Sequence, residues 1–327
     1  MRIGLIGAGQ FGRRHLETIR NEPQCELAGV ADPAYKGEKA YADYREMLER
    51  ERPDGVIIAT PNALHVPAGL ACVERRVPML VEKPIAETVA ASNELVAAAE
   101  RARVPLLVGH HRRYNPILEK AREVVQGGGI GRLTAVAALW LLQKPADYFD
   151  VAWRREPGGG PLLINAIHDI DDLRFVCGEI GQVRAITSNS ARELAVEDSA
   201  AVALRFANGA LGTLTVSDAV AAPWSWELAS GENPVYPPQE ESCYFFSGTE
   251  GALAVPRMTL FSYGEKKGWY APLTKKTLDV RREDPQPRQL RHFCRVIRGE
   301  EAPRIDGADA TRTLAVVEAI RKAALLP

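Results

Sequence analysis

The stretch LLINAIHDIDDL, residues 162–173, combines an apolar run with side chains that can exchange protons. Its ionisable residues are His168, Asp169, Asp171 and Asp172. Burying unpaired charge is costly, so this stretch is either a helix with one wet face or a site of chemistry. If a helix begins at Pro161, His168 shares a face with Asn165 and with Asp171 or Asp172. We expect one of these two aspartates to orient the imidazole, with Asp171 as our candidate, and at least one aspartate to be a solvated surface residue.

A glycine-rich turn follows the first apolar run of the chain. RIGLIGAGQFG has the GxGxxG spacing between a predicted strand and a predicted helix. This context predicts a tight turn, a close approach of the backbone to a pyrophosphate, and a helix N-terminus that faces the phosphates. The alternative is a tight turn that binds nothing. The candidate cofactor-binding residues of this turn are Gly7, Gly9, Gln10, Phe11 and Gly12.

Asp32 ends the second predicted strand, 23 positions after Gly9. This spacing suits a carboxylate that accepts hydrogen bonds from the ribose hydroxyls of the adenosine. The same charge would repel the 2′-phosphate of NADP, so the sequence favours NAD as the cofactor. Lys36 lies close by and keeps NADP as the less favoured alternative.

Lys83 lies in LVEKP, residues 80–84, at the end of a predicted strand. Ligands bind at the carboxyl ends of strands in open α/β sheets, so we expect Lys83 to face the ligand crevice. Pro84 fixes the turn and permits a cis peptide bond. A partly desolvated lysine beside an oxidised nicotinamide ring has a lowered pKa, which suits proton transfer near neutral pH. A surface lysine at a strand end is the equally weighted alternative.

Arginines follow the last strand of this first region. Arg112 and Arg113 lie in VGHHRRYNP, and Arg154 and Arg155 precede a glycine run. Arginines beside a site suit a carboxylate or phosphate on the substrate. Contact with the cofactor phosphates, or an ion pair between domains, is weighted equally. The adjacent histidines at 110 and 111 would face opposite ways on a strand, and no further ligands accompany them, so we expect no metal site.

Short apolar runs alternate with amphipathic stretches over the first 110 residues, which predicts a parallel sheet with helices on both faces. From residue 132 strand-like runs dominate, with a glycine-punctuated hairpin around 206–211. We therefore expect an α/β protein with two domains. Residues 1–118 form a doubly wound Rossmann domain for NAD. Residues 119–327 form an α+β domain with an open, mostly antiparallel sheet for substrate binding and oligomerisation, and the last helix packs back on the first domain.

The composition excludes several classes of protein. The 327 residues are 46% hydrophobic and 25% charged, with a formal net charge of −1. This balance does not indicate the excess of basic residues that is typical of proteins that bind nucleic acid or an anionic membrane. The five cysteines form no CxxC pair, which is typical of reduced thiols. No apolar run has the length of a membrane span, and the first residues lack the pattern of a secretory leader, so we expect a cytoplasmic protein.

Four motifs in order carry a family resemblance: GLIGAGQFGRRH, ATPNALH, LVEKP and GGGPLLINAIHDID. Together they resemble the Gfo/Idh/MocA family of NAD(P)-dependent oxidoreductases over roughly residues 1–180, and GTEGAL (248–253) is a weaker match. The resemblance implies a Rossmann domain, a second domain with an open sheet, and a site between them. It also implies a homodimer or homotetramer packed through that sheet.

The resemblance also implies roles for individual residues. Lys83 contacts nicotinamide and substrate, and His168 exchanges the substrate proton. Histidine suits that role because its unperturbed pKa is near neutral, although a core histidine held by hydrogen bonds is the alternative. The loop beside the cofactor comprises Thr60, Pro61, Asn62 and His65, with Glu82 close by.

One position departs from the family pattern. Many members place an aspartate four residues before the histidine, where it holds a sugar hydroxyl, and here that residue is Ile164, next to Asn165. We expect an NAD-dependent dehydrogenase or reductase for a small sugar-like, cyclic polyol or carboxylated ring substrate. Its candidate substrate-binding residues are Lys83, Arg112, Arg113, Asn165 and His168. Redox-assisted glycoside hydrolysis or elimination with retained NAD, and a sensor without chemistry, are the alternatives.

Overall fold

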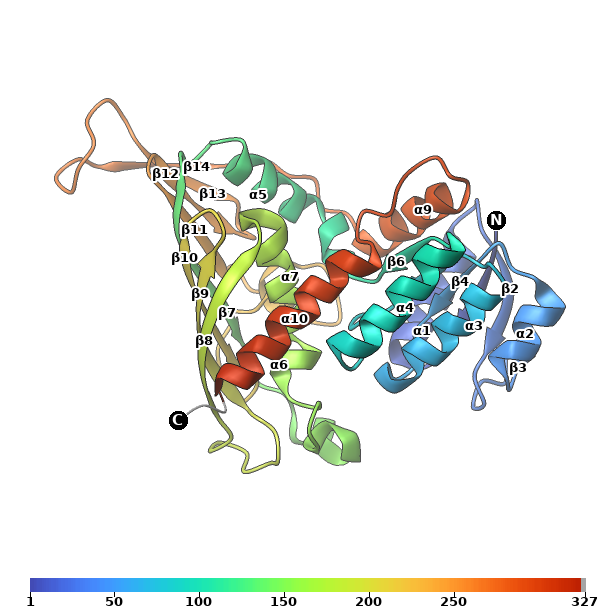
Figure 1. Ribbon diagram of the computed structural model, residues 1–327. Helices are drawn as coiled ribbons and strands as arrows, with labels where there is room; N and C mark the ends of the chain where they lie inside the picture. Colours follow the sequence, from blue (N-terminus) through green and yellow to red (C-terminus); the bar gives the residue numbers. More distant parts are fainter. Residues whose placement is uncertain (325–327) are drawn as a thin grey trace. The chain divides into compact units, whose positions relative to one another are not determined.

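The computed structural model describes residues 1–324, so the last three residues of the expected second domain and of its last helix lie outside the described residues. The chain divides into two compact units (Figure 1). The first comprises Met1–His111 and Gln286–Ala315. The second comprises Arg112–Pro285 and the chain from Val316 onward. The first unit therefore recruits a segment that lies far along the sequence.

The first unit contains a parallel sheet with the strand order β3-β2-β1-β4-β5-β6. The order reverses beside β1, and in doubly wound sheets the carboxyl ends of the strands at such a point form the ligand crevice. Nearly all residues of the strands predicted from apolar runs are buried, as parallel strands covered on both faces require. The strands are β1 (Arg2–Ile6), β2 (Glu26–Ala31), β3 (Ala40–Tyr41), β4 (Gly55–Ile58), β5 (Met79–Val81) and β6 (Leu106–Val108).

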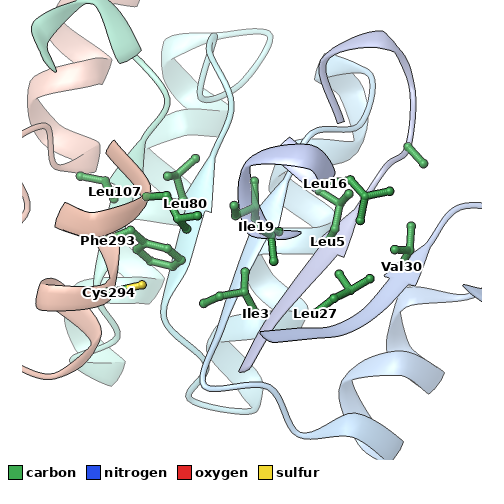
Figure 2. Packing of buried hydrophobic residues seen from close by; sticks show 13 residues of the cluster. Ile3, Leu5, Leu16, Ile19, Leu27, Val30, Leu80, Leu107, Phe293 and Cys294 are labelled. Atoms are coloured by element: carbon green, nitrogen blue, oxygen red, sulfur yellow. The ribbon is translucent and has the colours of Figure 1, made fainter. Parts of the chain in front are cut away.

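Helices cover this sheet, and one of them comes from the distant segment. The helices are α1 (Gln10–Asn21), α2 (Tyr44–Glu51), α3 (His65–Glu74), α4 (Val89–Ala102) and α9 (Pro285–Ile297), with the short 3-10 helix η1 (Asn62–Leu64). Leu290 and Phe293 of α9 are buried in one cluster with Leu80 and Leu107 of the sheet (Figure 2). Burial of a side chain such as Phe293 contributes about 1.5–3 kcal/mol, so α9 is part of the first unit's core.

The second unit contains an eight-stranded sheet with the order β14-β13-β12-β11-β7-β10-β9-β8. Its pairings are antiparallel except for β7 with β10, and β9 and β10 form the predicted hairpin. The prediction of a Rossmann sheet plus a mostly antiparallel open sheet is confirmed. The strands are β7 (Leu133–Leu141), β8 (Ile180–Ser188), β9 (Ser199–Phe206), β10 (Leu211–Ser217), β11 (Tyr244–Gly248), β12 (Gly251–Val255), β13 (Thr259–Tyr263) and β14 (Leu273–Thr277).

Helices lie on one face of this sheet, as the alternation of buried and exposed residues along β9 requires. They are α5 (Pro116–Gln126), α6 (Pro161–Ile164) and α7 (Ala166–Cys177), while α8 (Trp226–Ala229) follows β10, and α10 (Gly307–Ala324) begins within the first unit's segment. Three 3-10 turns complete the list: η2 (His111–Tyr114), η3 (Ala146–Asp150) and η4 (Ala152–Arg155). Within residues 1–324, none of the helices has the length and apolar character to span a membrane.

Candidate functional site

The glycine turn of the first unit has the geometry of a dinucleotide site. Gly7 has φ +91°, and a Cβ on Gly12 would lie 2.1 Å from the Gly7 carbonyl oxygen. Both positions therefore need glycine for the turn itself. A Cβ on Gly9, by contrast, would meet no described atom within 4 Å. The turn is thus packed tightly on two of its glycines and leaves space at the third.

Asp32 lies against this turn. Its Oδ2 accepts a hydrogen bond from the Ala8 N–H at 2.7 Å, and its Oδ1 accepts one from the Ala34 N–H at 2.8 Å. Gln10 and Phe11 open α1, and no side chain among the described residues caps this helix end. The N–H groups of an uncapped helix start carry a partial positive charge, so the turn, Asp32 and α1 fit the pyrophosphate and ribose of a dinucleotide.

The loop after β4 is tied to the turn that carries Lys83. His65 is buried, with Nδ1 2.7 Å from the Pro84 carbonyl oxygen and Nε2 2.9 Å from the Thr60 carbonyl oxygen. Burial lowers the pKa of His65, which favours the neutral ring. The Lys83–Pro84 peptide bond is cis. The Thr60 Oγ1 is buried without a hydrogen-bond partner among the described residues, as expected for a hydroxyl whose partner is a bound ligand.

Glu82 is a buried anion beneath this site. Its Oε1 lies 2.7 Å from His15 Nε2, and its Oε2 accepts a hydrogen bond from the Lys83 N–H at 3.1 Å. Burial favours the neutral acid, but the hydrogen bond and charge of His15 hold the pKa of Glu82 below its usual value. Because a Cβ on Gly109 would fall 2.7 Å from Oε1, Glu82 also fixes how closely the chain after β6 approaches. Glu82 therefore joins α1 to the ends of β5 and β6.

In the second unit, the helix that carries His168 is completely buried. Pro161 begins α6 as predicted, and Asn165 separates α6 from α7. The Asn165 Oδ1 is buried without a hydrogen-bond partner among the described residues. The prediction that one aspartate of this stretch is solvated is wrong, since Asp169, Asp171 and Asp172 are all buried. Arg113 pairs with Asp171, and Arg112 pairs with Asp172.

Arg113 binds Asp171 through two hydrogen bonds. Arg113 Nε donates to Asp171 Oδ2 at 2.7 Å, and Arg113 Nη2 donates to Asp171 Oδ1 at 2.6 Å. Arg174 adds a longer contact of 3.9 Å to the same carboxylate. Such a two-pronged ion pair is strongly directional. It gives Arg113 an anionic partner within its own unit.

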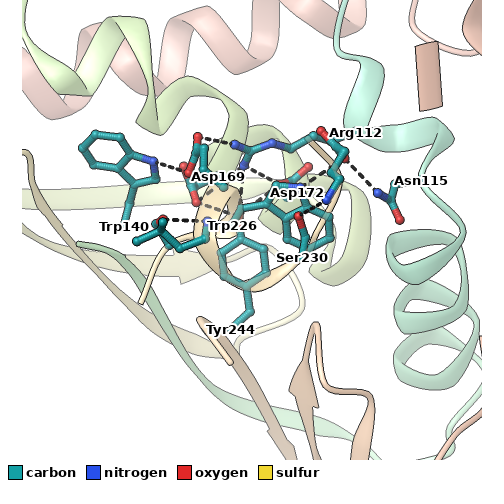
Figure 3. Close-up of polar contacts among 12 residues, drawn as sticks. Arg112, Asn115, Trp140, Asp169, Asp172, Trp226, Ser230 and Tyr244 are labelled. Carbon is teal, nitrogen blue, oxygen red and sulfur yellow. Dashed lines mark hydrogen bonds and ion pairs between the residues drawn. The ribbon is translucent and has the colours of Figure 1, made fainter. Parts of the chain in front are cut away.

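Arg112 lies in a second buried network with three carboxylates (Figure 3). Its guanidinium donates to Asp172 at 3.2 Å and to Glu227 at 2.7 Å, and it lies 3.8 Å from Asp169. The Tyr244 hydroxyl donates to Asp169 at 2.6 Å. Glu227 also accepts a hydrogen bond from Trp140 Nε1 at 3.0 Å.

Several groups of this network have shifted pKa values. Burial raises the pKa of Asp169 to about 7 and raises that of Asp172 well above its usual range. Burial alone would lower the pKa of Arg112, but Glu227, Tyr244 and the aspartates raise it well above its ordinary value. Sequence reasoning missed Glu227 and Tyr244, because they reach Arg112 from α8 and β11 and no local motif marks them.

The predicted site residues thus lie in two groups, one in each unit. The first contains the glycine turn, Asp32, the residues 60–65 loop, Glu82 and Lys83. The second contains Arg112, Arg113, Asn165, His168 and Asp171. Within residues 1–324, no three His, Cys, Asp or Glu side chains are arranged to hold a metal ion.

Two family models match the chain. One, described as an oxidoreductase family with an NAD-binding Rossmann fold, matches residues 1–110, and the Gfo/Idh/MocA C-terminal domain matches residues 118–254. The chain belongs to the Gfo/Idh/MocA family of oxidoreductases. The glycine turn and Asp32 accordingly lie in an NAD-binding domain.

Relatives within the family act on several substrates. The rhizopine catabolism protein MocA of Rhizobium meliloti is 34% identical over 187 residues, which are 54% of this chain and only 57% of that protein's length. The D-apiose dehydrogenase of Paraburkholderia graminis is 28% identical over 341 aligned positions, 96% of this chain and 85% of that protein. The WlbA dehydrogenase of Bordetella pertussis, crystallised with NADH and UDP-GlcNAcA, has the same fold, with a TM-score of 0.79, 24% identity, and coverage of 99% and 96% of the two chains.

Proposed function

We propose that this family member is an NAD-dependent dehydrogenase or reductase for a secondary alcohol or its carbonyl in a small sugar-like, cyclic polyol or carboxylated ring substrate. The observation that carries the proposal is the glycine turn with Asp32 against it and with open space at Gly9. NAD, when bound, takes up or supplies the hydride at nicotinamide C4. The relatives named for apiose and for a complex with UDP-GlcNAcA support a sugar-like substrate.

Lys83 and His168 have separate tasks in this proposal. Lys83 donates a hydrogen bond to the reacting oxygen of the substrate and polarises it. His168 takes the hydroxyl proton during oxidation and returns it during reduction, because histidine titrates near neutral pH. Asn165 supports substrate placement, since its buried amide oxygen has no partner among the described residues.

The two arginines suit positioning better than direct substrate binding. Arg113 holds Asp171, which lies one turn after His168 on α7, and Arg112 holds Asp172 on the same helix. We infer that both pairs fix the position of α7 and thereby that of the His168 imidazole.

The five free cysteines suit a reducing, cytoplasmic setting.

The proposal is tested by measuring NADH formation, as absorbance at 340 nm, with a panel of sugars, cyclic polyols and hydroxy acids. General acid–base residues contribute about 10²–10⁴-fold, so Lys83→Ala and His168→Ala should each lose at least about 100-fold in kcat. Both variants should still bind NAD, and Lys275→Ala, an exposed lysine of β14, is the control. Wild-type activity with neither variant affected would refute the assigned roles. Substrate loss without net NADH would instead indicate redox-assisted hydrolysis or elimination.

A further inference from the structure

Lys144 lies at an edge of the second sheet where two parallel strands end together. Leu141 at the end of β7 pairs with Ser217 at the end of β10. Lys144 follows β7 and Asp218 follows β10, and the Lys144 N–H donates to the Asp218 carbonyl oxygen at 2.8 Å. The backbone therefore fixes these two side chains beside each other.

The Lys144 ammonium is buried and has fewer hydrogen-bond acceptors than N–H donors among the described residues. The residue is only 7% exposed, and its Nζ lies 3.2 Å from Asp218 Oδ2 without hydrogen-bond geometry. Nζ also lies 4.6 Å from the centre of the Tyr148 ring and 5.6 Å from that of Trp140. An ammonium has three N–H donors, and among the described residues only the Asp218 carboxylate lies within reach of them. A buried cation in this state lacks part of the stabilisation that water would give it.

Lys144 and Arg192 pair with the same carboxylate, that of Asp218. Asp218 is shared, because its Oδ1 accepts a hydrogen bond from Arg192 Nε at 2.9 Å. Arg192 also donates to the Lys144 carbonyl oxygen at 3.1 Å and stacks 4.4 Å from the Phe149 ring. One carboxylate thus serves two cations. Burial accordingly lowers the pKa of Lys144, even though Asp218 opposes this shift.

One loop connects this cluster to the start of the helical stretch that leads to His168. Arg192 lies in the loop before β9, and its N–H donates to Asp198 Oδ2 at 2.9 Å. The neighbouring Glu197 accepts a hydrogen bond from the Leu162 N–H in α6 at 3.1 Å. The loop that supplies Arg192 therefore also holds the first turn of α6.

The pairing differs from that around Arg112. There one arginine faces three carboxyl groups, and Arg113 pairs with Asp171. Both arginines expected from the sequence to bind a substrate anion thus have acidic partners in their own unit. Lys144 and Arg192, by contrast, share the carboxylate of Asp218.

We propose that Lys144, supported by Arg192, binds an anionic oxygen group of the substrate, a carboxylate or a phosphate. This inference rests on the proposed function and narrows its substrate class to acidic sugars or acidic rings. The anion accepts the unused N–H donors of Lys144 and completes the charge that Asp218 only half supplies. Neutral polyols offer no such group.

The test compares acidic ligands with neutral ligands of similar ring size and hydroxylation. D-Glucuronate, D-glucose 6-phosphate and D-glucose form one set, and quinate and myo-inositol form another. Each is titrated by calorimetry into the NAD-bound protein and assayed for NAD reduction. At least one acid should bind more tightly than its neutral partner, and the carboxylate and phosphate arms identify the group. A charge-assisted hydrogen bond is worth about a tenfold or greater change in Kd, and Lys144→Met should show that loss for the acid alone.

Lys144→Arg should restore part of the acid binding, while Lys275→Met should behave as wild type. We expect Lys144→Met to raise KM for the acid with little change in kcat, and to leave NAD affinity and the melting temperature near wild-type values. Equal binding of acids and neutral partners, no binding of any acid, or an unchanged Kd in Lys144→Met would overturn the inference. Oxidation of neutral members alone would overturn it while upholding the proposed function. Acid binding that depends on Lys144 without NAD reduction would uphold the anion site and reject the dehydrogenase.

Discussion

At the scale of single residues, the buried charges of the second unit differ in how fully they are compensated. Asp171 accepts two hydrogen bonds from Arg113, whereas the Asp169 carboxyl group accepts one from the Tyr244 hydroxyl and lies 3.8 Å from Arg112. The Asp169 Oδ2 is buried without a hydrogen-bond partner among the described residues. Burial raises the pKa of Asp169, and we expect this shift to appear in the pH dependence of stability.

We predict that Asp169→Asn flattens part of the stability profile between about pH 4 and pH 7. Burial raises the pKa of Asp169 from 3.8 to about 7, so the folded protein binds this proton more tightly than the unfolded chain. The stabilising contribution is complete below pH 4 and is lost as the pH rises through 7, at about 1.4 kcal/mol per pKa unit. The amide oxygen of the variant can still accept the hydrogen bond from Tyr244. Urea unfolding at several pH values should show wild type losing stability relative to the variant as pH rises, with Asp279→Asn as the control; parallel profiles would refute the prediction.

A second residue prediction concerns cofactor choice. Asp32→Asn keeps an oxygen for the Ala8 or Ala34 N–H but removes the charge that repels a 2′-phosphate. We expect the ratio of NAD to NADP affinity to fall by at least about tenfold, which corresponds to about 1.4 kcal/mol. Fluorescence titrations with NADH and NADPH measure both affinities, and Glu49→Gln on the surface of α2 is the control. An unchanged ratio would mean that Asp32 does not set the preference.

Residues with a local signature were predictable from the sequence. The glycine spacing and the strand end at Asp32 follow from rules of backbone geometry, and the structure places these residues together. The partners of buried charges were not predictable. Glu227 lies 115 positions from Arg112. In the sequence Lys144 has no distinguishing feature, and only the structure shows that it is buried and pairs with Asp218.

At the scale of elements, the glycine turn makes a prediction that separates folding from binding. A methyl group on Gly12 would collide with the Gly7 carbonyl oxygen at 2.1 Å, whereas one on Gly9 has open space. Gly12→Ala should therefore lower the melting temperature by several degrees, about 1–3 kcal/mol of overpacking. Gly9→Ala should fold like wild type but bind NAD more weakly, because the added methyl occupies the space for the pyrophosphate. Thermal melts and NADH titrations distinguish the two, and equal NADH affinity in Gly9→Ala and wild type would contradict the site.

A second element prediction concerns the docking of α9. Cys25, just before β2, and Cys294 of α9 bring their sulfur atoms to 3.4 Å. The hydrogen bond between them lowers the pKa of Cys294 and raises that of Cys25, so Cys294 is the better nucleophile. Diamide should form an intrachain disulfide between these two residues, detected by peptide mapping under non-reducing conditions. Cys72, which is deeply buried, should stay unreacted. A map without the 25–294 link would argue against this placement of α9.

Element prediction from sequence succeeded where periodicity was strong. The apolar runs of the first 110 residues became β1, β2, β4, β5 and β6. The two-residue edge strand β3 is too short to have a pattern. Sequence reasoning also missed α9, although Leu290, Phe293 and Cys294 lie on one helical face, because the preceding polar segment obscured where the helix begins.

At the scale of the whole molecule, the second sheet has one face under helices and one face open. Along β9 the residues on the covered face are buried, while Ala201 and Ala203 on the opposite face are exposed. Ile186 of β8 is 76% exposed on this open face. Small residues and an exposed isoleucine on a flat sheet are suited to close packing against another protein surface. The family resemblance implied an oligomer packed through this sheet, but the sequence alone does not show which face is covered.

We therefore predict a homodimer, or a tetramer built from it, that packs through this face. A stable interface buries roughly 1,200–2,000 Å², which an eight-stranded sheet can supply, and the alanines allow backbones to approach closely. Ala203→Glu places a charge and added bulk on this face, beside Ile186 of the neighbouring strand, and should give monomers in size-exclusion chromatography with light scattering. Leu273→Glu, at an equally exposed position of β14, the strand at the other end of the sheet, should leave the assembly intact. A monomeric wild type, or a dimer unaffected by Ala203→Glu, would show that the open face serves another purpose.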